Sequence, residues 1–203
     1  MNPKVLFLTS KSINGDNQVD SAVISLYPFG DIDQDFLERV KTNCYRDLPG
    51  SFPQLEVEDG ALDIPEQGYV EQRRQYRASA FLTRLEEKSP ESIHAIGLVD
   101  EDLFTPKLNF VFGVAQPERN AVVALSRLKP QFYGKPRNTN VFELRVVKEI
   151  LHELGHIFRL RHCDNHCVMR FSNKLSQTDL KPAEYCETCY TDLQAITQND
   201  LER

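Results

Sequence analysis

Residues 152–171 read HELGHIFRLRHCDNHCVMRF, and this stretch holds four of the chain's five histidines and two of its five cysteines. Apolar side chains lead into it at roughly helical spacing: Phe142, Val146, Val147, Ile150, Leu151, Leu154 and Phe158. This spacing predicts one long helix that is largely buried. Asn140 followed by Glu143 is a capping-box pattern, which predicts where the helix starts. The polar residues of the stretch therefore interrupt a buried helix.

Two histidines on this helix have the spacing of metal ligands. His152 and His156 are four residues apart, so both imidazoles lie on one face and can bind a single ion. Glu153 lies about 100° further round, where it can reach a metal-bound water and act as general base. If the helix ends near residues 158–160, the chain can turn back and present His162 as a third ligand, leaving the fourth position to water, as in catalytic zinc sites. The alternative is that all three are ordinary polar histidines.

Four of the five cysteines form two close pairs. A Cx3C pair and a Cx2C pair can close four thiolates round one structural zinc ion with no open position: Cys163, Cys167, Cys186 and Cys189. Disulfides or a redox CxxC are the alternatives, and they are disfavoured in a reducing compartment. His166 could replace one sulfur, whereas Cys44 is expected to be a buried free thiol. The sequence thus predicts two zinc ions per chain, one catalytic and one structural.

The composition is that of an ordinary globular protein with one sizeable domain. The chain has 203 residues, of which 40% are hydrophobic and 27% charged. A net charge of -6 gives no electrostatic footprint for nucleic acid or an anionic membrane, so neither partner is expected. The apolar run Val5 to Leu8 is too short for a secretory signal. A cytoplasmic location is therefore expected.

Strand-like runs alternate with amphipathic helices, which predicts an α/β domain with helices packed on a sheet. The expected strands are residues 22–26, 55–62, 93–99, 109–115 and 120–128, with the first one broken at Tyr27-Pro28. A helix carrying Phe36, Leu37 and Val40 follows the first strand, and another is expected over residues 72–87. The last two strands are joined by a connection short enough for a hairpin.

Several of these segments resemble the archaemetzincins, a family of metzincin-type zinc metallopeptidases. The resemblance is carried by HELGHIFRLRHC, CVM and CETC, and upstream by QYRASAFLTRL, GLVDEDLFTPKLNFVFGVA and NAVVALSRL, and it covers most of residues 20–195. It implies a mixed, twisted sheet with packed helices, an active-site helix carrying HExxH, and a small zinc-containing C-terminal subdomain. Residues 1–203 would form one metzincin-like catalytic domain, with subdomains at 1–158 and 159–203.

The resemblance also implies roles for individual residues. His152, His156 and His162 resemble the catalytic zinc ligands and Glu153 the general base, while Cys163, Cys167, Cys186 and Cys189 resemble the ligands of a second zinc. Met169, otherwise a core filler, resembles the Met-turn residue that packs beneath the ligands. The chain departs from the family by carrying Arg159 where glycine usually ends the helix, and a non-glycine residue in a left-handed turn costs about 1 kcal/mol. The interval between Cys163 and Cys167 and the interval between Met169 and Cys186 are each about one residue shorter than is usual in the family.

The expected function is that of a zinc-dependent metallopeptidase, an aminopeptidase among the possible forms, in which Glu153 activates a zinc-bound water to cleave a peptide or protein substrate. Residues 120–128 are a candidate edge strand for an extended peptide. Tyr133 and Arg170 are candidates for stabilising the oxyanion. The rival function is a zinc-stabilised peptide-binding module without turnover, which would have no use for Glu153. A zinc-ribbon nucleic-acid binder is disfavoured by the acidic charge balance.

Overall fold

The computed structural model describes residues 23–88 and 94–201. A five-stranded sheet with the strand order β2-β1-β5-β9-β8 forms its centre. The first four strands are parallel and β8 is antiparallel to β9. The strands are β1 Val23–Phe29, β2 Gln54–Val57, β5 His94–Val99, β8 Gly113–Ala115 and β9 Asn120–Ala124. The predicted mixed α/β architecture is confirmed.

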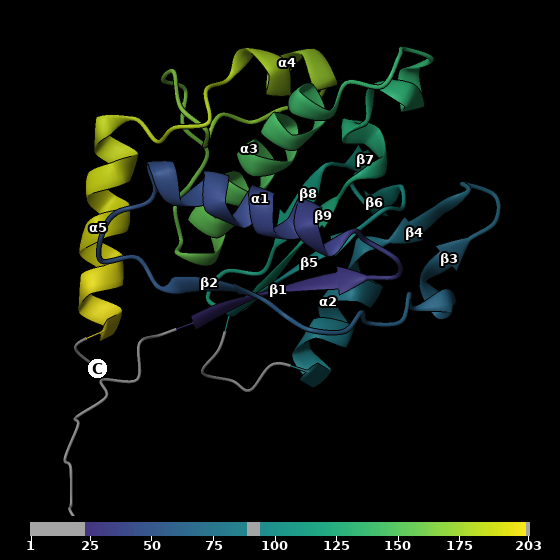
Figure 1. Cartoon of the computed structure of the whole chain (residues 1–203), viewed down its shortest axis with the longest axis horizontal. Helices are drawn as coiled ribbons and strands as arrows, with labels where there is room; N and C mark the ends of the chain where they lie inside the picture. Colours follow the sequence, from purple (N-terminus) through teal and green to yellow (C-terminus); the bar gives the residue numbers. More distant parts are fainter. Residues whose placement is uncertain (1–22, 89–93, 202–203) are drawn as a thin grey trace, which may run out of the picture.

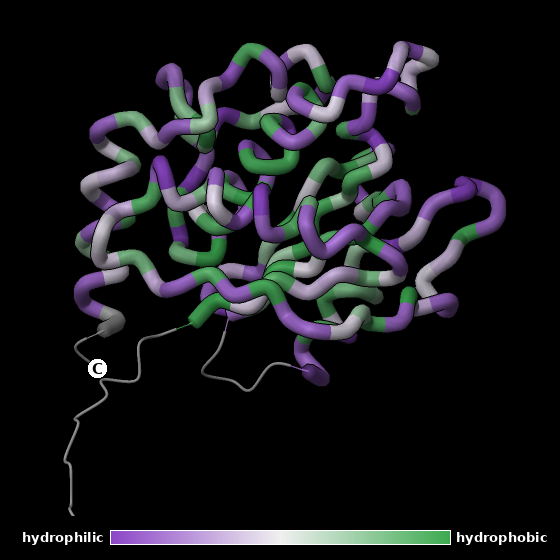
Figure 2. Tube along the Cα trace, viewed as in Figure 1, coloured by the Kyte–Doolittle hydropathy of each residue, from purple (hydrophilic) through white to green (hydrophobic). Residues whose placement is uncertain are grey.

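Helices cover both faces of this sheet. Helices α1 (Gln34–Cys44) and α3 (Thr139–Ile157) pack on one face and α2 (Ala78–Lys88) on the other (Figure 1). Successive strand residues point to opposite faces, so in β9 Ala121 and Val123 join the core beneath α3, while Val122 joins the core beneath α2. Hydrophobic segments accordingly gather in the interior (Figure 2).

A second sheet lies beyond one end of the central sheet and the last helix of the chain lies beyond the other end (Figure 1). The second sheet has the order β3-β4-β6-β7: Tyr69–Val70, Gln75–Arg77, Leu103–Thr105 and Leu108–Val111. The C-terminal segment carries α4 (Leu175–Leu180) and α5 (Glu187–Leu201). Short 3-10 helices connect elements: η1 Tyr45–Asp47, η2 Glu66–Gly68, η3 Ser126–Leu128 and η4 Pro130–Tyr133. Within the described ranges no helix has the length and hydropathy needed to cross a membrane.

Several predicted elements have different bounds in the structure. The strand expected over residues 55–62 ends at Val57, and the strand expected over residues 120–128 ends at Ala124 and is followed by η3. The helix expected over residues 72–87 begins only at Ala78, because residues 69–77 form the short β3-β4 hairpin with Arg74 in a left-handed turn. The strand expected over residues 109–115 bends at Phe112, so its first half is β7 of the second sheet and its second half is β8 of the central sheet. Apolar content predicted extended backbone but not the change of sheet.

The first strand continues through the break expected at Pro28. The Pro28 carbonyl accepts a hydrogen bond from Leu62 N–H at 2.8 Å. This bond lies on the same side of the strand as the bond from Glu58 N–H to the Leu26 carbonyl. By strand alternation the missing N–H of Pro28 also points to this side, where β2 has already ended at Val57. Proline therefore costs no ladder hydrogen bond here.

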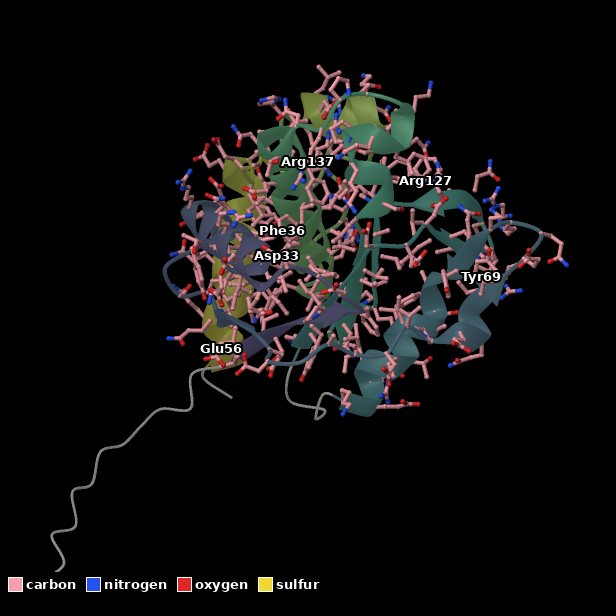
Figure 3. All side chains as sticks on the ribbon, turned by 45° about the vertical axis from the view of Figure 1, so that its right-hand side comes forward. Asp33, Phe36, Glu56, Tyr69, Arg127 and Arg137 are labelled. Atoms are coloured by element: carbon pink, nitrogen blue, oxygen red, sulfur yellow. The ribbon has the colours of Figure 1, made fainter. Side chains whose placement is uncertain are left out.

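Helices α1 and α3, which pack on the same face of the central sheet, both begin at side-chain caps. Asp33 accepts the N–H of Phe36 at 2.7 Å at the start of α1, where both residues are labelled in Figure 3. The cap of α3 is Asn138, whose side chain accepts from Val141 N–H at 3.1 Å, so the prediction of Asn140 was wrong by two residues. Glu143 forms no capping box and instead pairs with Arg39 of α1 at 2.8 Å.

Strand β9 is an interior strand, so the prediction that residues 120–128 form the edge was wrong. It pairs with β5 on one side and with β8 on the other, and all five of its residues are buried. The edge of the central sheet on this side is β8, joined to β9 by the predicted hairpin.

Candidate active site

Helix α3 ends in a turn that reverses the chain. Its C-cap is Phe158, and the next residue, Arg159, has a left-handed φ of 66°. Arg159 N–H donates to the His156 carbonyl at 3.0 Å, and Leu160 N–H donates to the Gly155 carbonyl at 2.8 Å. These two bonds define a Schellman motif. The helix therefore stops where the spacing predicted, with arginine in the position that favours glycine.

The turn brings three imidazoles together. The Nε2 atom of His156 lies 3.2 Å from Nε2 of His152 and 3.2 Å from Nε2 of His162. Nδ1 of His152 lies 2.9 Å from the Val168 carbonyl, and Nδ1 of His156 lies 2.8 Å from the Leu160 carbonyl. A carbonyl only accepts, so each Nδ1 carries the proton and each Nε2 keeps a free lone pair directed at the common centre.

The spacing of these nitrogens suits a zinc ion. Two nitrogens bound to a tetrahedral zinc at 2.0–2.1 Å lie about 3.3 Å apart, close to the observed 3.2 Å. Burial, followed by the charge of Lys181, lowers the pKa of His152 well below its usual 6.5. Burial also lowers the pKa of His156 and His162. These lowered pKa values favour the neutral form of the three rings, which is the form that binds metal.

Glu153 is buried beside the histidines, with 3% of its surface exposed. Its side chain lies against the backbone of β8, since a Cβ added to Gly113 would lie 2.5 Å from Glu153 Oε1 and 2.8 Å from Cδ. The other oxygen, Oε2, has no hydrogen-bond partner among the described residues. Burial, then the charge of Glu149, raises the Glu153 pKa well above its usual 4.5. The site thus contains a desolvated carboxyl group with one oxygen unused.

Met169 packs directly beneath α3. Its side chain is fully buried, and its Sδ and Cε atoms leave no room for a Cβ on Gly155. The preceding residue, Val168, supplies the carbonyl that orients His152. The close packing expected at Gly155 is therefore observed, and residues 168–169 support the histidines from below.

The four paired cysteines converge on a second centre. Their Sγ atoms all lie within 4.8 Å of one another, and Cys163 Sγ lies 3.7 Å from Cys186 Sγ. Sulfurs bound to a tetrahedral zinc at 2.3 Å lie about 3.8 Å apart. No disulfide joins any of the five cysteines in the structure. Cys44 is the buried free thiol that was expected, and His166 is exposed and outside the cluster.

Hydrogen bonds prepare this cluster for a cation. The Sγ atom of Cys167 accepts the N–H groups of Met169 at 3.4 Å and Cys186 at 3.2 Å. Burial opposes ionisation of the Cys186 thiol, but hydrogen bonds from Cys189 N–H, Asn165 and the neighbouring thiols lower its pKa to about 6. Backbone donors aimed at sulfur favour the thiolate form that metals require, but burial still raises the pKa of the Cys167 and Cys189 thiols.

A cleft of about 780 Å³ lies over the histidines. Its lining includes residues of β7 and β8 with Phe112 between them, residues of α3 and the turn that follows it, and residues 171–173 and Lys181. Tyr133 and Arg170 are exposed, and neither is among the residues that line the cleft. The structure therefore does not bring either oxyanion candidate to the cleft.

Comparison with known proteins identifies the family. The model of "Peptidase family M54" matches residues 40–195. The archaemetzincin of Methanocaldococcus jannaschii is 36% identical over an alignment that covers 84% of this chain and 92% of that protein. The chain belongs to the archaemetzincin family. The resemblance predicted from HELGHIFRLRHC and CETC is thereby confirmed.

Two solved structures have a fold similar to that of this chain. The crystal structure of archaemetzincin from Methanopyrus kandleri is 34% identical with a TM-score of 0.73, and the match covers 90% of this chain and 96% of that one. A zinc-dependent peptidase from Methanocorpusculum labreanum is 27% identical with a TM-score of 0.76, covering 84% and 99% of the two chains. The chain is accordingly a zinc metallopeptidase, as the sequence predicted.

The arginine at the helix end allows a direct test of the turn. Arg159→Gly is expected to be more stable than Arg159→Ala by about 1 kcal/mol, because glycine adopts the left-handed conformation without strain. Both variants lose the ion pair with Glu118, which joins two side chains that are each 56% exposed and therefore contributes little. The measurement is the free energy of unfolding in urea. Equal values for the two variants would contradict strain at this residue.

Proposed function

We propose that His152, His156 and His162 hold the catalytic zinc of this peptidase and that Glu153 is its general base. The observation that carries the proposal is the convergence of three free imidazole nitrogens beside a buried carboxyl group with one unpartnered oxygen. When bound, zinc supplies a Lewis acid that polarises the scissile carbonyl and makes a water molecule easier to deprotonate.

Glu153 moves one proton in each direction during the reaction. Its Oε2 accepts the proton of the attacking water as the new C–O bond forms, and the carboxylic acid then donates that proton to the nitrogen of the leaving amine as the C–N bond breaks. The raised pKa of Glu153 suits both steps, because a carboxyl group with an ordinary pKa would be a poor base and a short-lived acid. The Leu160 and Val168 carbonyls meanwhile hold His156 and His152 in the tautomer that exposes Nε2.

We place the substrate along β8, in place of the strand predicted from the sequence. Phe112 and Gln116 make hydrogen bonds toward β9, so the backbone groups of Gly113 and Ala115, which alternate with them, point to the open edge. An extended peptide can pair with these groups as an additional strand. Such pairing would hold its main chain beside the Glu153 carboxyl group, which contacts Gly113.

The four cysteines would hold a second, structural zinc, giving two ions per chain. Cys163 follows α3 closely in the sequence, while Cys186 and Cys189 lie at the start of α5, so one ion would join the C-terminal segment to the active-site helix. This supports dividing the catalytic domain into subdomains 1–158 and 159–203 around the cleft. Thiols kept free for a metal suit a reducing compartment, and we place the protein in the cytoplasm.

The alternative function, peptide binding without turnover, does not account for Glu153. Burying a carboxyl group with an unused oxygen is costly, and a binding module has no need of it. The test is incubation of the zinc-loaded protein with a peptide library, followed by mass spectrometry of the products. Cleavage should stop on chelation and return with added zinc. A protein that carries two zinc ions and cleaves no peptide would support the binding module instead.

Gly113 is expected to keep Glu153 in position. Gly113→Ala would place a methyl group 2.5 Å from Oε1, so the carboxyl group must move, and displacements of about 1 Å near the reacting atoms can cost about 100-fold in rate. We expect kcat to fall by about 10- to 100-fold, with zinc content unchanged because Glu153 is not a ligand. The matched control is Gly50→Ala, since a Cβ there meets nothing within 4 Å. Unchanged kcat in Gly113→Ala would contradict this contact.

A further inference from the structure

Unpartnered polar atoms gather in the cleft. In the described part of the chain, five buried side-chain nitrogen or oxygen atoms have no hydrogen-bond partner. Three of them belong to residues that line the cleft: Glu153 Oε2, Ser172 Oγ and Lys181 Nζ. Proton transfer accounts for the first. The other two atoms can both donate, and their residues line the space that the substrate of the proposed function would occupy.

Lys181 is a buried ammonium group with too few acceptors. Its side chain is 1% exposed, and its Nζ lies 3.0 Å from Oε1 of Glu149 without making a hydrogen bond among the described residues. That same Glu149 oxygen is also approached by Thr178 Oγ1 at 3.3 Å. An ammonium group has three protons to donate, and burying it with one imperfect acceptor is costly.

The neighbouring buried cations each make two or more hydrogen bonds. Arg145 donates to both carboxylate oxygens of Asp179, at 2.7 and 2.8 Å, and to the Leu128 carbonyl at 2.8 Å. Lys148 donates to the carbonyls of Thr178 and Asp179 at 3.0 and 3.1 Å. Neither Arg145 nor Lys148 belongs to the described cleft lining, whereas Lys181 does. Of these three cations, only Lys181, whose residue lines the cleft, makes no hydrogen bond among the described residues.

The charge of Lys181 reaches the catalytic centre. Lys181 lines the same cleft as His152, His156 and His162. Its positive charge therefore lies near the atoms that would hold the scissile bond. An anionic group on a bound peptide could reach Lys181 without leaving the cleft.

We propose that Lys181 Nζ and Ser172 Oγ form a carboxylate-binding subsite of the cleft, so that the peptidase prefers peptides with a carboxylate close to the scissile bond. A carboxylate supplies the acceptors that both donors lack, and a charge-assisted hydrogen bond in a buried site is stronger than a neutral one. The carboxylate comes from an aspartate or glutamate side chain or from the end of the peptide. This inference rests on the proposed function only for the place of the substrate.

The test measures binding rather than cleavage. Zinc-loaded Glu153→Gln protein, which should not consume its ligand, is titrated in a calorimeter with acetylated, amidated hexapeptides carrying one glutamate or one glutamine at each position in turn. A second set compares the same neutral peptides with a free or an amidated C-terminus. We expect one placement of the carboxylate to bind about tenfold or more tightly than its neutral counterpart. An internal placement identifies a side chain, and a free terminus identifies an exopeptidase-like site.

Variants then assign the preference to the two residues. Lys181→Met is combined with Glu149→Gln, because removing one partner alone would leave a buried unpaired charge. In the Lys181→Met/Glu149→Gln protein, peptides with and without the carboxylate should bind with about equal affinity. Lys181→Arg should keep most of the preference. Ser172→Ala, a milder change, should reduce the preference severalfold and is informative even if the double replacement does not fold. Zinc content and unfolding midpoints serve as checks on folding.

Two results would overturn the subsite. One is equal affinity for charged and neutral peptides at every placement, and the other is a preference that survives unchanged in both the Lys181→Met/Glu149→Gln and the Ser172→Ala proteins. If apolar peptides bind more tightly but charged and neutral counterparts do not differ, the outcome counts as the first of these results. Because no step of the test requires hydrolysis, absence of peptidase activity in the unsubstituted protein would count against the proposed function and not against this subsite.

Discussion

Glu153→Gln is expected to lower kcat/KM for peptide hydrolysis by about 100- to 10,000-fold, the range that general acid–base catalysis contributes. Glutamine keeps the size of the side chain and its contact with Gly113, but it cannot take a proton from water. His152, His156 and His162 are unaltered, so the zinc content should remain that of the unsubstituted protein. The measurements are kcat/KM on a peptide found by library screening and zinc per chain by atomic emission.

Glu153→Asp provides the matched control for charge. It keeps a carboxylate but draws it back by one methylene, so we expect activity between those of the unsubstituted protein and Glu153→Gln. Hydrolysis at an undiminished rate in Glu153→Gln would exclude this residue as the base. Loss of zinc from Glu153→Gln would instead show that the carboxylate belongs to the ligand set.

The same substitution has a pH-dependent effect on the stability of the metal-free protein. Burial, then the charge of Glu149, raises the Glu153 pKa above 4.5 in the folded state. The folded protein therefore holds a proton that the unfolded chain releases, so its stability declines as the pH rises above the unfolded-state value. The glutamine side chain does not titrate, so it adds no such dependence of stability on pH. The difference in unfolding midpoint between Glu153→Gln and the unsubstituted protein should widen in favour of the variant from about pH 5 to about pH 8, and a constant difference would contradict burial of this carboxyl group.

Local spacing predicted the parts of the site that depend on one helix and its end. His152 and His156 are one helical turn apart in any α-helix, and the reversal that brings His162 back needs only the stop that follows Ile157. The convergence of Cys163, Cys167, Cys186 and Cys189 also followed from spacing, because two short thiol pairs separated by a loop can close on one centre.

Features that depend on long-range packing were not predictable from such patterns. Strand β9 has the composition of a strand wherever it lies in the sheet, so nothing local distinguished an interior strand from an edge. Gly113 reads as one glycine in an apolar run, and its contact with Glu153 arises from residues forty positions apart. Lys181 follows a polar segment and is charged, features that predict exposure, yet the fold buries it beside Glu149.

Cys186→Ser combined with Cys189→Ser is expected to reduce the zinc content from two ions per chain to one. The change removes two of the four sulfurs that meet within 4.8 Å, and two thiolates cannot replace the closed tetrahedral set of a structural site. The histidine centre should keep its ion, because its three ligands lie on α3 and the turn after it.

Loss of the second ion should also destabilise the C-terminal segment. Binding free energy at a structural zinc site contributes directly to folding, and a loss of several kcal/mol is expected. Hydrogen exchange should increase first in α5, whose Leu193 and Cys189 pack in the core beneath α3.

Cys44→Ser is the matched control for the double cysteine variant, because Cys44 is also a buried free thiol but lies outside the cluster. It should lose some stability through its polar hydroxyl group in the core while retaining both zinc ions. Zinc per chain, measured on dialysed protein, therefore separates ligation from packing, since only ligation changes the count. If Cys186→Ser/Cys189→Ser retains two ions, the four thiols do not form a zinc site, and the C-terminal segment must be held to α3 by its apolar contacts alone.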